Sequence, residues 1–182
     1  MENVFKIEYK VNDDFLNEML KLDKSVYNGK NCGVLRTCKE WISVNNEIYT
    51  MLLCDGEIIG YINFMPITDE CYNSFIKGEK RDYQITNKDI LPFSKDKGNK
   101  CLLTSVLIRE DFRNGIAIQY LLNGFFERLK KYKDENILIS KIVLDCVSED
   151  GEKFAKRYFD AKFIRQTKTG KIYESDLASL NI

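Results

Sequence analysis

The sequence predicts a single α/β domain built around one twisted central sheet. A chain of 182 residues suits one domain of ordinary size. Apolar runs with the two-residue period of strands alternate along it with runs that have the period of helices. No internal repeat, low-complexity tract or linker divides residues 1–182. Since 44% of the residues are hydrophobic, we expect a packed globular fold.

The N-terminal part of the chain predicts one strand followed by two helices. Val4 to Tyr9 alternates weakly between apolar and polar side chains, as a strand does. Asn12 or Asp13 can cap the first helix, which carries an apolar stripe. Thr37 and Glu40 have the spacing of a capping box, so a second, shorter helix is expected to open there.

The next part of the chain predicts a hairpin and then a long connection. Residues 48–54 and 57–65 are rich in strand-forming residues and are joined by an Asp-Gly pair, which predicts a β-hairpin. Residues 66–100 are polar and irregular, and Asp69 can cap a short helix within them. A connection of this length is either functional or mobile.

The C-terminal part of the chain predicts strands and helices in alternation, closed by a second hairpin. Asn114 or Gly115 is expected to start a long amphipathic helix that reaches Leu129. Ser148 is expected to cap a short helix that ends at Phe159. The expected strands span residues 101–108, 137–147, 162–166 and 171–174.

The composition excludes several kinds of active site. The chain has no histidine, which rules out Ser-His-Asp and Cys-His nucleophile systems in their usual form and His-ligated metals. Its six cysteines form no C-x-x-C pair, so no metal site is expected. Any proton transfer must therefore use carboxylates, tyrosine, lysine, cysteine or ordered water.

Charge and hydropathy bear on partners and location. The 28 basic residues equal the 28 acidic ones, which argues against a dedicated nucleic-acid binder. No segment approaches the roughly 20 apolar residues that span a bilayer, and Met1 to Lys10 has no signal-peptide core. We therefore expect a soluble, reduced, cytoplasmic protein that binds neither membranes nor nucleic acids.

An anion site is predicted where the strand at 101–108 passes into the following helix. A helix N-terminus offers unpaired N–H groups and a partial positive charge. Gly115 at this turn lets a phosphate approach those groups closely, and Arg113 adds a permanent cation. The alternative is that Gly115 is a plain turn residue and Arg113 a solvated surface charge.

This segment resembles motif A of the GCN5-related N-acetyltransferase (GNAT) superfamily. Phe112-Arg113 matches the aromatic-Arg pair, and Leu121-Leu122 matches the paired leucines of the helix. The glycine loop is one residue out of step with the family's pattern. The resemblance implies that this loop holds the pyrophosphate of acetyl-CoA. The implied contacts come from Arg113, Asn114, Gly115, Ile116, Ala117 and Ile118.

A second segment, residues 151–163, resembles motif B of the same superfamily. Tyr158 and Phe163 keep the family's five-residue interval, whereas Gly151 stands where the family often has an asparagine that helps to hold the cofactor. The resemblance implies that Tyr158 donates a proton to the departing CoA thiolate. A phenol with a pKa near 10 is suited to that step. The alternative is an ordinary helix aromatic packed on the sheet.

The resemblance also implies the layout of the whole domain, residues 1–182. It implies a central mixed, mostly antiparallel twisted sheet flanked by helices on both faces. The fourth and fifth strands of this fold splay apart, and the pantetheine arm pairs with the fourth strand. Val106, Leu107 and Ile108 would then lie along the cofactor, and the Leu107 N–H would polarise the thioester carbonyl.

The function implied is acetyl-CoA-dependent transfer of an acetyl group to an amine, on a small molecule or a peptide. The general base stays open among Asp69, Glu70, Asp145 and a water chain, while Ser105 and Cys146 are not needed as nucleophiles. The long connection is expected to shape the acceptor site. Two other functions remain open: an inactive acyl-CoA-binding or regulatory module, and a nucleotide-phosphate binder. A homodimer is possible through the sheet edge.

Overall fold

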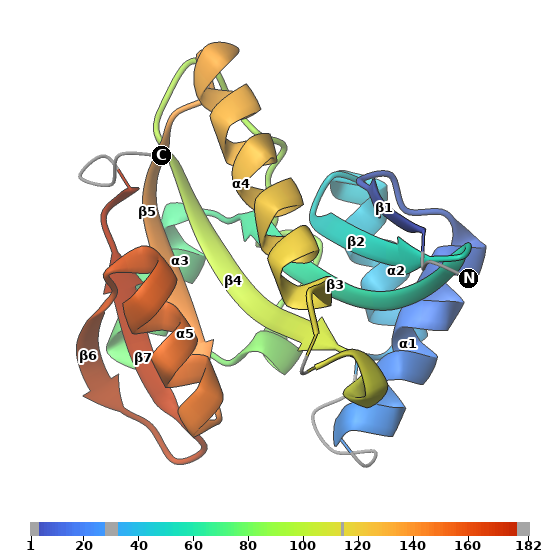
Figure 1. The fold of residues 1–182 in the computed structure, drawn as a ribbon. Helices are drawn as coiled ribbons and strands as arrows, with labels where there is room; N and C mark the ends of the chain where they lie inside the picture. Colours follow the sequence, from blue (N-terminus) through green and yellow to red (C-terminus); the bar gives the residue numbers. More distant parts are fainter. Residues whose placement is uncertain (1–3, 28–32, 114, 178–182) are drawn as a thin grey trace.

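A computed structural model describes residues 4–27, 33–113 and 115–177, and it contains one seven-stranded sheet (Figure 1). The strand order is β1-β2-β3-β4-β5-β7-β6. Only the β4–β5 pair is parallel, which confirms the mixed, mostly antiparallel sheet. The strands are β1 (Phe5–Glu8), β2 (Tyr49–Cys54), β3 (Glu57–Pro66), β4 (Asn99–Ile108), β5 (Ile139–Cys146), β6 (Lys162–Gln166) and β7 (Lys171–Ser175).

Helices cover both faces of the sheet, as expected. In Figure 1, α4 and α5 lie in front of the sheet, and α1, α2 and α3 lie behind it. Each face has its own apolar core, one around Phe125 and Phe159 and the other around Trp41 and Phe75. The helices are α1 (Asp13–Tyr27), α2 (Leu35–Val44), α3 (Asp69–Lys77), α4 (Ala117–Asp134) and α5 (Glu149–Phe159), with short 3₁₀ turns η1 (Asp82–Gln84) and η2 (Glu110–Phe112).

Two of the expected helix caps are confirmed. The Asn12 side chain accepts the Phe15 N–H at 2.8 Å, and the Ser148 hydroxyl accepts the Gly151 N–H at 3.1 Å. Each bond satisfies one of the free N–H groups in a first helical turn.

The capping box expected at Thr37 is wrong. Helix α2 begins at Leu35, and the Val34 carbonyl already accepts the Cys38 N–H at 2.9 Å. Thr37 therefore lies inside the first turn, where it cannot act as the cap.

The cap expected at Asp69 is displaced by one residue. The Thr68 hydroxyl accepts the Cys71 N–H at 3.2 Å, so Asp69 is the first residue of α3 rather than its cap. The connection around it is more regular than its polar sequence suggests, because α3 buries Phe75 completely and Ile85 and Ile90 are also buried.

Helix α4 starts later than expected, at Ala117. The turn η2 precedes it, and the Gly115 N–H donates to the Phe112 carbonyl at 3.3 Å. Gly115 therefore belongs to the turn, and Ile116 is the N-cap. Asn114, the other residue expected to start the helix, lies outside the described residues.

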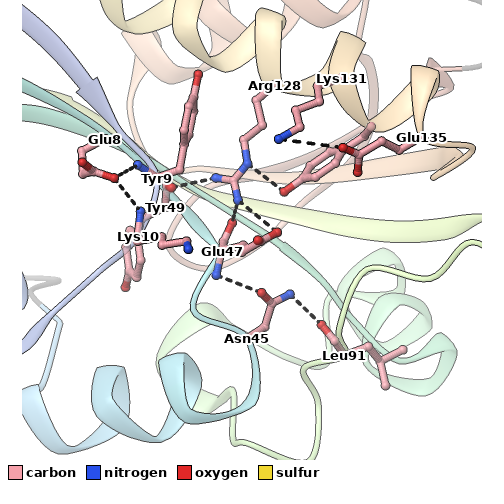
Figure 2. A network of polar contacts seen from close by, with 11 residues as sticks. Glu8, Tyr9, Lys10, Asn45, Glu47, Tyr49, Leu91, Arg128, Lys131 and Glu135 are labelled. Atoms are coloured by element: carbon pink, nitrogen blue, oxygen red, sulfur yellow. Dashed lines mark hydrogen bonds and ion pairs between the residues drawn. The ribbon is translucent and has the colours of Figure 1, made fainter.

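A buried arginine ties α4 to the start of β2 (Figure 2). Arg128 is 8% exposed, and its guanidinium donates to the Tyr49 carbonyl at 2.7 Å, to the Glu47 carbonyl and to the Tyr132 hydroxyl at 2.7 Å. The fork of an arginine suits this use because its donors lie in fixed directions. Among the described residues, no helix is both long enough and apolar enough to cross a bilayer.

Candidate functional site

The centre of the sheet opens between β4 and β5. The two strands pair from Asn99 and Ile139 as far as Leu103 and Leu144, and no pairing between them follows. Figure 1 shows them side by side at one end and diverging toward their C-terminal ends. On its other side β4 stays paired with β3 up to Ile108. The second half of β4 therefore has one edge free to pair with an extended ligand.

A β-bulge lies where the opening begins. Asn63 of β3 pairs with Ser105, whereas the next residue, Phe64, pairs with Leu103, so Thr104 is the extra residue of β4. The Thr104 hydroxyl donates to the Asn63 side-chain oxygen at 2.5 Å. Bulges of this kind bend a strand and redirect its groups, and they are frequent beside active sites.

The register past the bulge decides which N–H groups face the opening. The Arg109 N–H donates to the Ile59 carbonyl of β3 at 2.7 Å. Donors of an antiparallel strand point alternately to either side, so the Leu107 N–H also points at β3, toward Tyr61. The N–H groups of Val106 and Ile108 point into the opening instead. The assignment of the Leu107 N–H to the thioester carbonyl is therefore corrected, and its side chain is buried in the core of α1–α3.

The predicted anion site lies at the end of β4, where η2 passes into α4. No side chain of the described residues caps the N-terminus of α4. Arg113 is exposed, and its Nε donates to the Ile108 carbonyl at 3.2 Å. A hollow of about 640 Å³, here the Gly115 cavity, opens beside this loop. Its lining residues are Phe5, Asp111, Phe112, Gly115, Ile116, Ala117 and Tyr120.

Gly115 is not required by the packing of the protein itself. A Cβ at this position would meet only the Phe112 carbonyl oxygen, at an ordinary 3.7 Å. The remaining space around it is open, so the backbone of the loop is accessible to a ligand. Ile116 is 55% exposed, Ala117 is buried, and Ile118 packs partly buried against the core. The side chains at the start of α4 thus range from exposed to buried, while the backbone at Gly115 stays accessible.

Tyr158 lies in the last turn of α5, half-buried against the core. Its ring is 5.0 Å from that of Phe154, and the Arg157 guanidinium lies 5.3 Å from its ring centre. Its hydroxyl forms no hydrogen bond with the described residues. Phe163, its partner in the second motif, is 54% exposed on β6. The contacts leave the hydroxyl available, and its catalytic role stays a prediction.

A second hollow, here the Asp23 cavity, lies on the opposite face of β4 from α4. It has a volume of about 350 Å³ between α1, α2 and strands β2 to β4. Its lining residues are Asp23, Gly33, Val34, Thr37, Cys38, Trp41, Tyr49, Tyr61, Asn63, Asp82, Tyr83, Thr104 and Ser105. Because Thr104 and Ser105 belong to it, the cavity adjoins the bulge where the opening begins.

Asp23 is the buried carboxylate of this cavity. It is 6% exposed, and it accepts hydrogen bonds from the Tyr61 hydroxyl and from the Gly33 N–H at 3.1 Å. Burial raises the pKa of Asp23, and these two donors only partly oppose that shift. Sequence reasoning missed this residue. The available signal was its position, since Asp23 shares the apolar stripe of α1 with Leu16 and Met19.

The expected candidates for a general base occupy different surroundings. Asp69 pairs with Lys100 at 2.9 Å, is 74% exposed and lines neither cavity; the hydrogen bond from Lys100 lowers its pKa. Glu70 is also exposed. Asp145 lies on β5 beyond the last pairing with β4 and is buried beside Arg81, at 2.8 Å. Burial outweighs the cation and raises the pKa of Asp145 to about 6.

The candidate nucleophiles are poorly suited to attack. Cys146 is buried, and burial raises the pKa of its thiol to about 12, so it stays protonated at neutral pH. Cys38 in the Asp23 cavity behaves in the same way, with a pKa raised by burial to about 11. Ser105 lines the same cavity, but no histidine exists in the chain to activate it.

Comparison with known proteins finds similarity in structure alone. No family model matches the sequence, and no curated protein matches it. The loading GNATL domain of CurA from Lyngbya majuscula superimposes with a TM-score of 0.61 at 11% identity, covering 98% of this chain and 100% of that one. PH1933 from Pyrococcus horikoshii OT3 gives 0.60 at 17% identity, with 98% and 100% covered.

A third similar structure was solved with a ligand. Arabidopsis thaliana Naa50, in complex with the bisubstrate analogue CoA-Ac-MVNAL, gives a TM-score of 0.58 at 12% identity, covering 93% of this chain and 95% of that one. At such low identity the likeness shows the fold and nothing finer. The chain has the GNAT fold, as the two motifs implied.

Proposed function

We propose that this protein is an acetyl-CoA-dependent N-acetyltransferase that passes an acetyl group directly to an amine. The observation that carries the proposal is the opening between β4 and β5. One end of it meets the N-terminus of α4, where no side-chain cap is present among the described residues, and the other meets the Asp23 cavity. An acetyl-CoA molecule laid along β4 would therefore reach from an anion site to a separate hollow on the other face of the sheet.

The residues present suit coenzyme A. The first N–H groups of α4 and the exposed Arg113 favour a pyrophosphate, and the open backbone at Gly115 lets it approach. The pantetheine arm has amides that can pair with the free edge of β4 at Val106 and Ile108.

Two groups of the chain serve the transfer. The Val106 N–H polarises the thioester carbonyl, because it lies farther than Ile108 from the pyrophosphate loop and next to the bulge. The amine nitrogen then bonds to the carbonyl carbon as the carbon–sulfur bond breaks. Tyr158 gives a proton to the departing thiolate, and the proton of the amine leaves to water or to a carboxylate. The products are an N-acetyl amine and free coenzyme A.

Thermal melting with acetyl-CoA tests the cofactor. At one hundred times the dissociation constant, a ligand of the native state stabilises it by about 2.7 kcal/mol. For a chain of this size that raises the melting temperature by roughly 5 to 10 °C. ATP and NAD serve as controls, and a larger shift with either would favour a nucleotide-phosphate binder. No shift with millimolar acetyl-CoA would contradict the proposal.

An inactive acyl-CoA-binding module on the same fold is the second candidate. Gly151 favours it, because a glycine stands in the first turn of α5 where a cofactor-holding asparagine is frequent. Tyr158→Phe separates the two functions. An enzyme should lose most of its release of CoA thiol while its melting shift with acetyl-CoA persists. A binding module would bind acetyl-CoA equally well in both forms and release no thiol from either.

A further inference from the structure

The charge of the Asp23 cavity is one-sided. Two of its lining residues, Asp23 and Asp82, are acidic, and none of the described lining residues is lysine or arginine. Trp41, Tyr49 and Tyr61 add aromatic walls. Aromatic faces attract cations, and a hollow that contains only carboxylates as charged groups repels a carboxylate ligand.

Asp23 has hydrogen bonds but no counter-ion among the described residues. Its two bonds come from a phenol and a backbone N–H, both of them neutral donors. A buried carboxylate is costly unless a charge pairs with it, and natural structures normally supply that partner. The missing charge can come from a ligand, since Asp23 lies in the wall of a hollow large enough to admit one.

The same cavity reaches the end of the opening where the thioester is proposed to lie, beside Val106. Thr104 and Ser105 line it, and Ser105 directly precedes Val106, whose N–H faces the space between β4 and β5. A linear molecule could therefore place one end at the bulge and the other at Asp23. Of the two ends, only the one at Asp23 meets a buried negative charge.

We infer that the Asp23 cavity selects a small alkyl diamine as acceptor, with the distal ammonium held by the Asp23 carboxylate and the near amine presented at Ser105. This inference rests on the proposed acetyl transfer for its reaction, but the cation site itself does not depend on it. A free amino acid is disfavoured, because its carboxylate would enter an acidic hollow without a matching cation.

The test uses the full chain, acetyl-CoA and three acceptors of equal length: a diamine, a monoamine and an ω-amino acid. The readout is kcat/KM for release of CoA thiol. We expect the diamine to exceed the monoamine by at least about tenfold, as for a charge-assisted hydrogen bond, and the amino acid to be the poorest. Asp23→Asn, which keeps the shape of the side chain, should reduce the ratio of kcat/KM for the diamine to kcat/KM for the monoamine to near one. Asp14→Asn, an exposed position on α1, should keep it.

Melting with the diamine alone separates this inference from the proposed function. The diamine should raise the melting temperature of the wild type and of Asp14→Asn more than that of Asp23→Asn, whether or not the protein turns over. An acetyl-CoA shift in Asp23→Asn shows that this variant folds. Equal use of diamine and monoamine by an active wild type overturns the inference, and so does preference for the amino acid. If acetyl-CoA neither binds nor reacts, the proposed function fails, and selective diamine binding still decides the cation site.

Discussion

Asp145 predicts an unusual dependence of stability on pH. Its side chain is 4% exposed, and burial raises its pKa from an ordinary 3.8 to about 6 despite the Arg81 guanidinium at 2.8 Å. Neither carboxylate oxygen accepts a hydrogen bond in good geometry from the described residues. The native state therefore holds a proton that the unfolded chain has already released, over the interval between these two pKa values.

The size and sign of the effect follow from proton linkage. A pKa raised by about 2 units corresponds to about 3 kcal/mol, at about 1.4 kcal/mol for each unit. Because the folded state binds the extra proton, this contribution to stability is present below pH 3.8 and is lost as the pH rises to about 6. This direction is opposite to that of a carboxylate held in a favourable ion pair.

Urea unfolding of the wild type and of Asp145→Asn, repeated across this interval, measures the effect. The free energy of unfolding of the wild type, relative to the variant, should fall by about 3 kcal/mol as the pH rises through the interval. Asp89→Asn is the matched control, since Asp89 is also shielded but pairs with Lys80 at 2.6 Å. Burial acts to raise the pKa of Asp89, but the hydrogen bonds from Lys80 and Thr86 outweigh it and lower that pKa. The difference in unfolding free energy between the wild type and Asp89→Asn should therefore stay flat above pH 4. A flat or rising difference for Asp145 would refute the reasoning.

Two further substitutions test the anion site and the fold. Gly115→Ala should leave the melting temperature unchanged, because the added Cβ meets only one atom, at 3.7 Å. If a phosphate uses that space, the same substitution should weaken acetyl-CoA binding by about tenfold, as measured by calorimetry. Arg128→Leu should lower the free energy of unfolding by about 3 kcal/mol, because it leaves the carbonyls of Tyr49 and Glu47 without their donor. The control Lys131→Ala, at the surface, should change the free energy of unfolding by less than about 0.5 kcal/mol.

The parts of the fold that the sequence predicted well have local causes. The hairpin of β2 and β3 follows from an Asp-Gly pair, in which Asp55 and Gly56 both adopt positive φ. The cap at Ser148 needs only a hydroxyl three residues before an N–H. The capping box expected at Thr37 is wrong because α2 begins two residues earlier, after the N-cap residue Val34. Valine has no side-chain group that can cap a helix, so the sequence carries no capping signal at this start.

The Asp23 cavity could not be predicted in the same way. It brings together α1, α2, three strands and the turn at Asp82, which are far apart in the chain. Only the packing of these elements decides that Asp23 faces a hollow rather than solvent. The long connection contributes Asp82 and Tyr83 to its wall. The expectation that this segment shapes the acceptor site stays a prediction.

The bulge at Thr104 explains why Leu107 was a natural but incorrect choice for the donor to the thioester. The Asn99 N–H points to the side of β5, where it donates at 2.8 Å to the carbonyl of Leu138, the residue before that strand, whereas the Arg109 N–H points to β3. In a regular strand, residues ten apart face the same way, and every odd-numbered N–H, including that of Leu107, would face the opening. The extra residue reverses the alternation, so that Val106 takes that place. The same residue turns Thr104 and Ser105 together toward the Asp23 cavity, and the two proposed substrates therefore meet at this irregularity of β4.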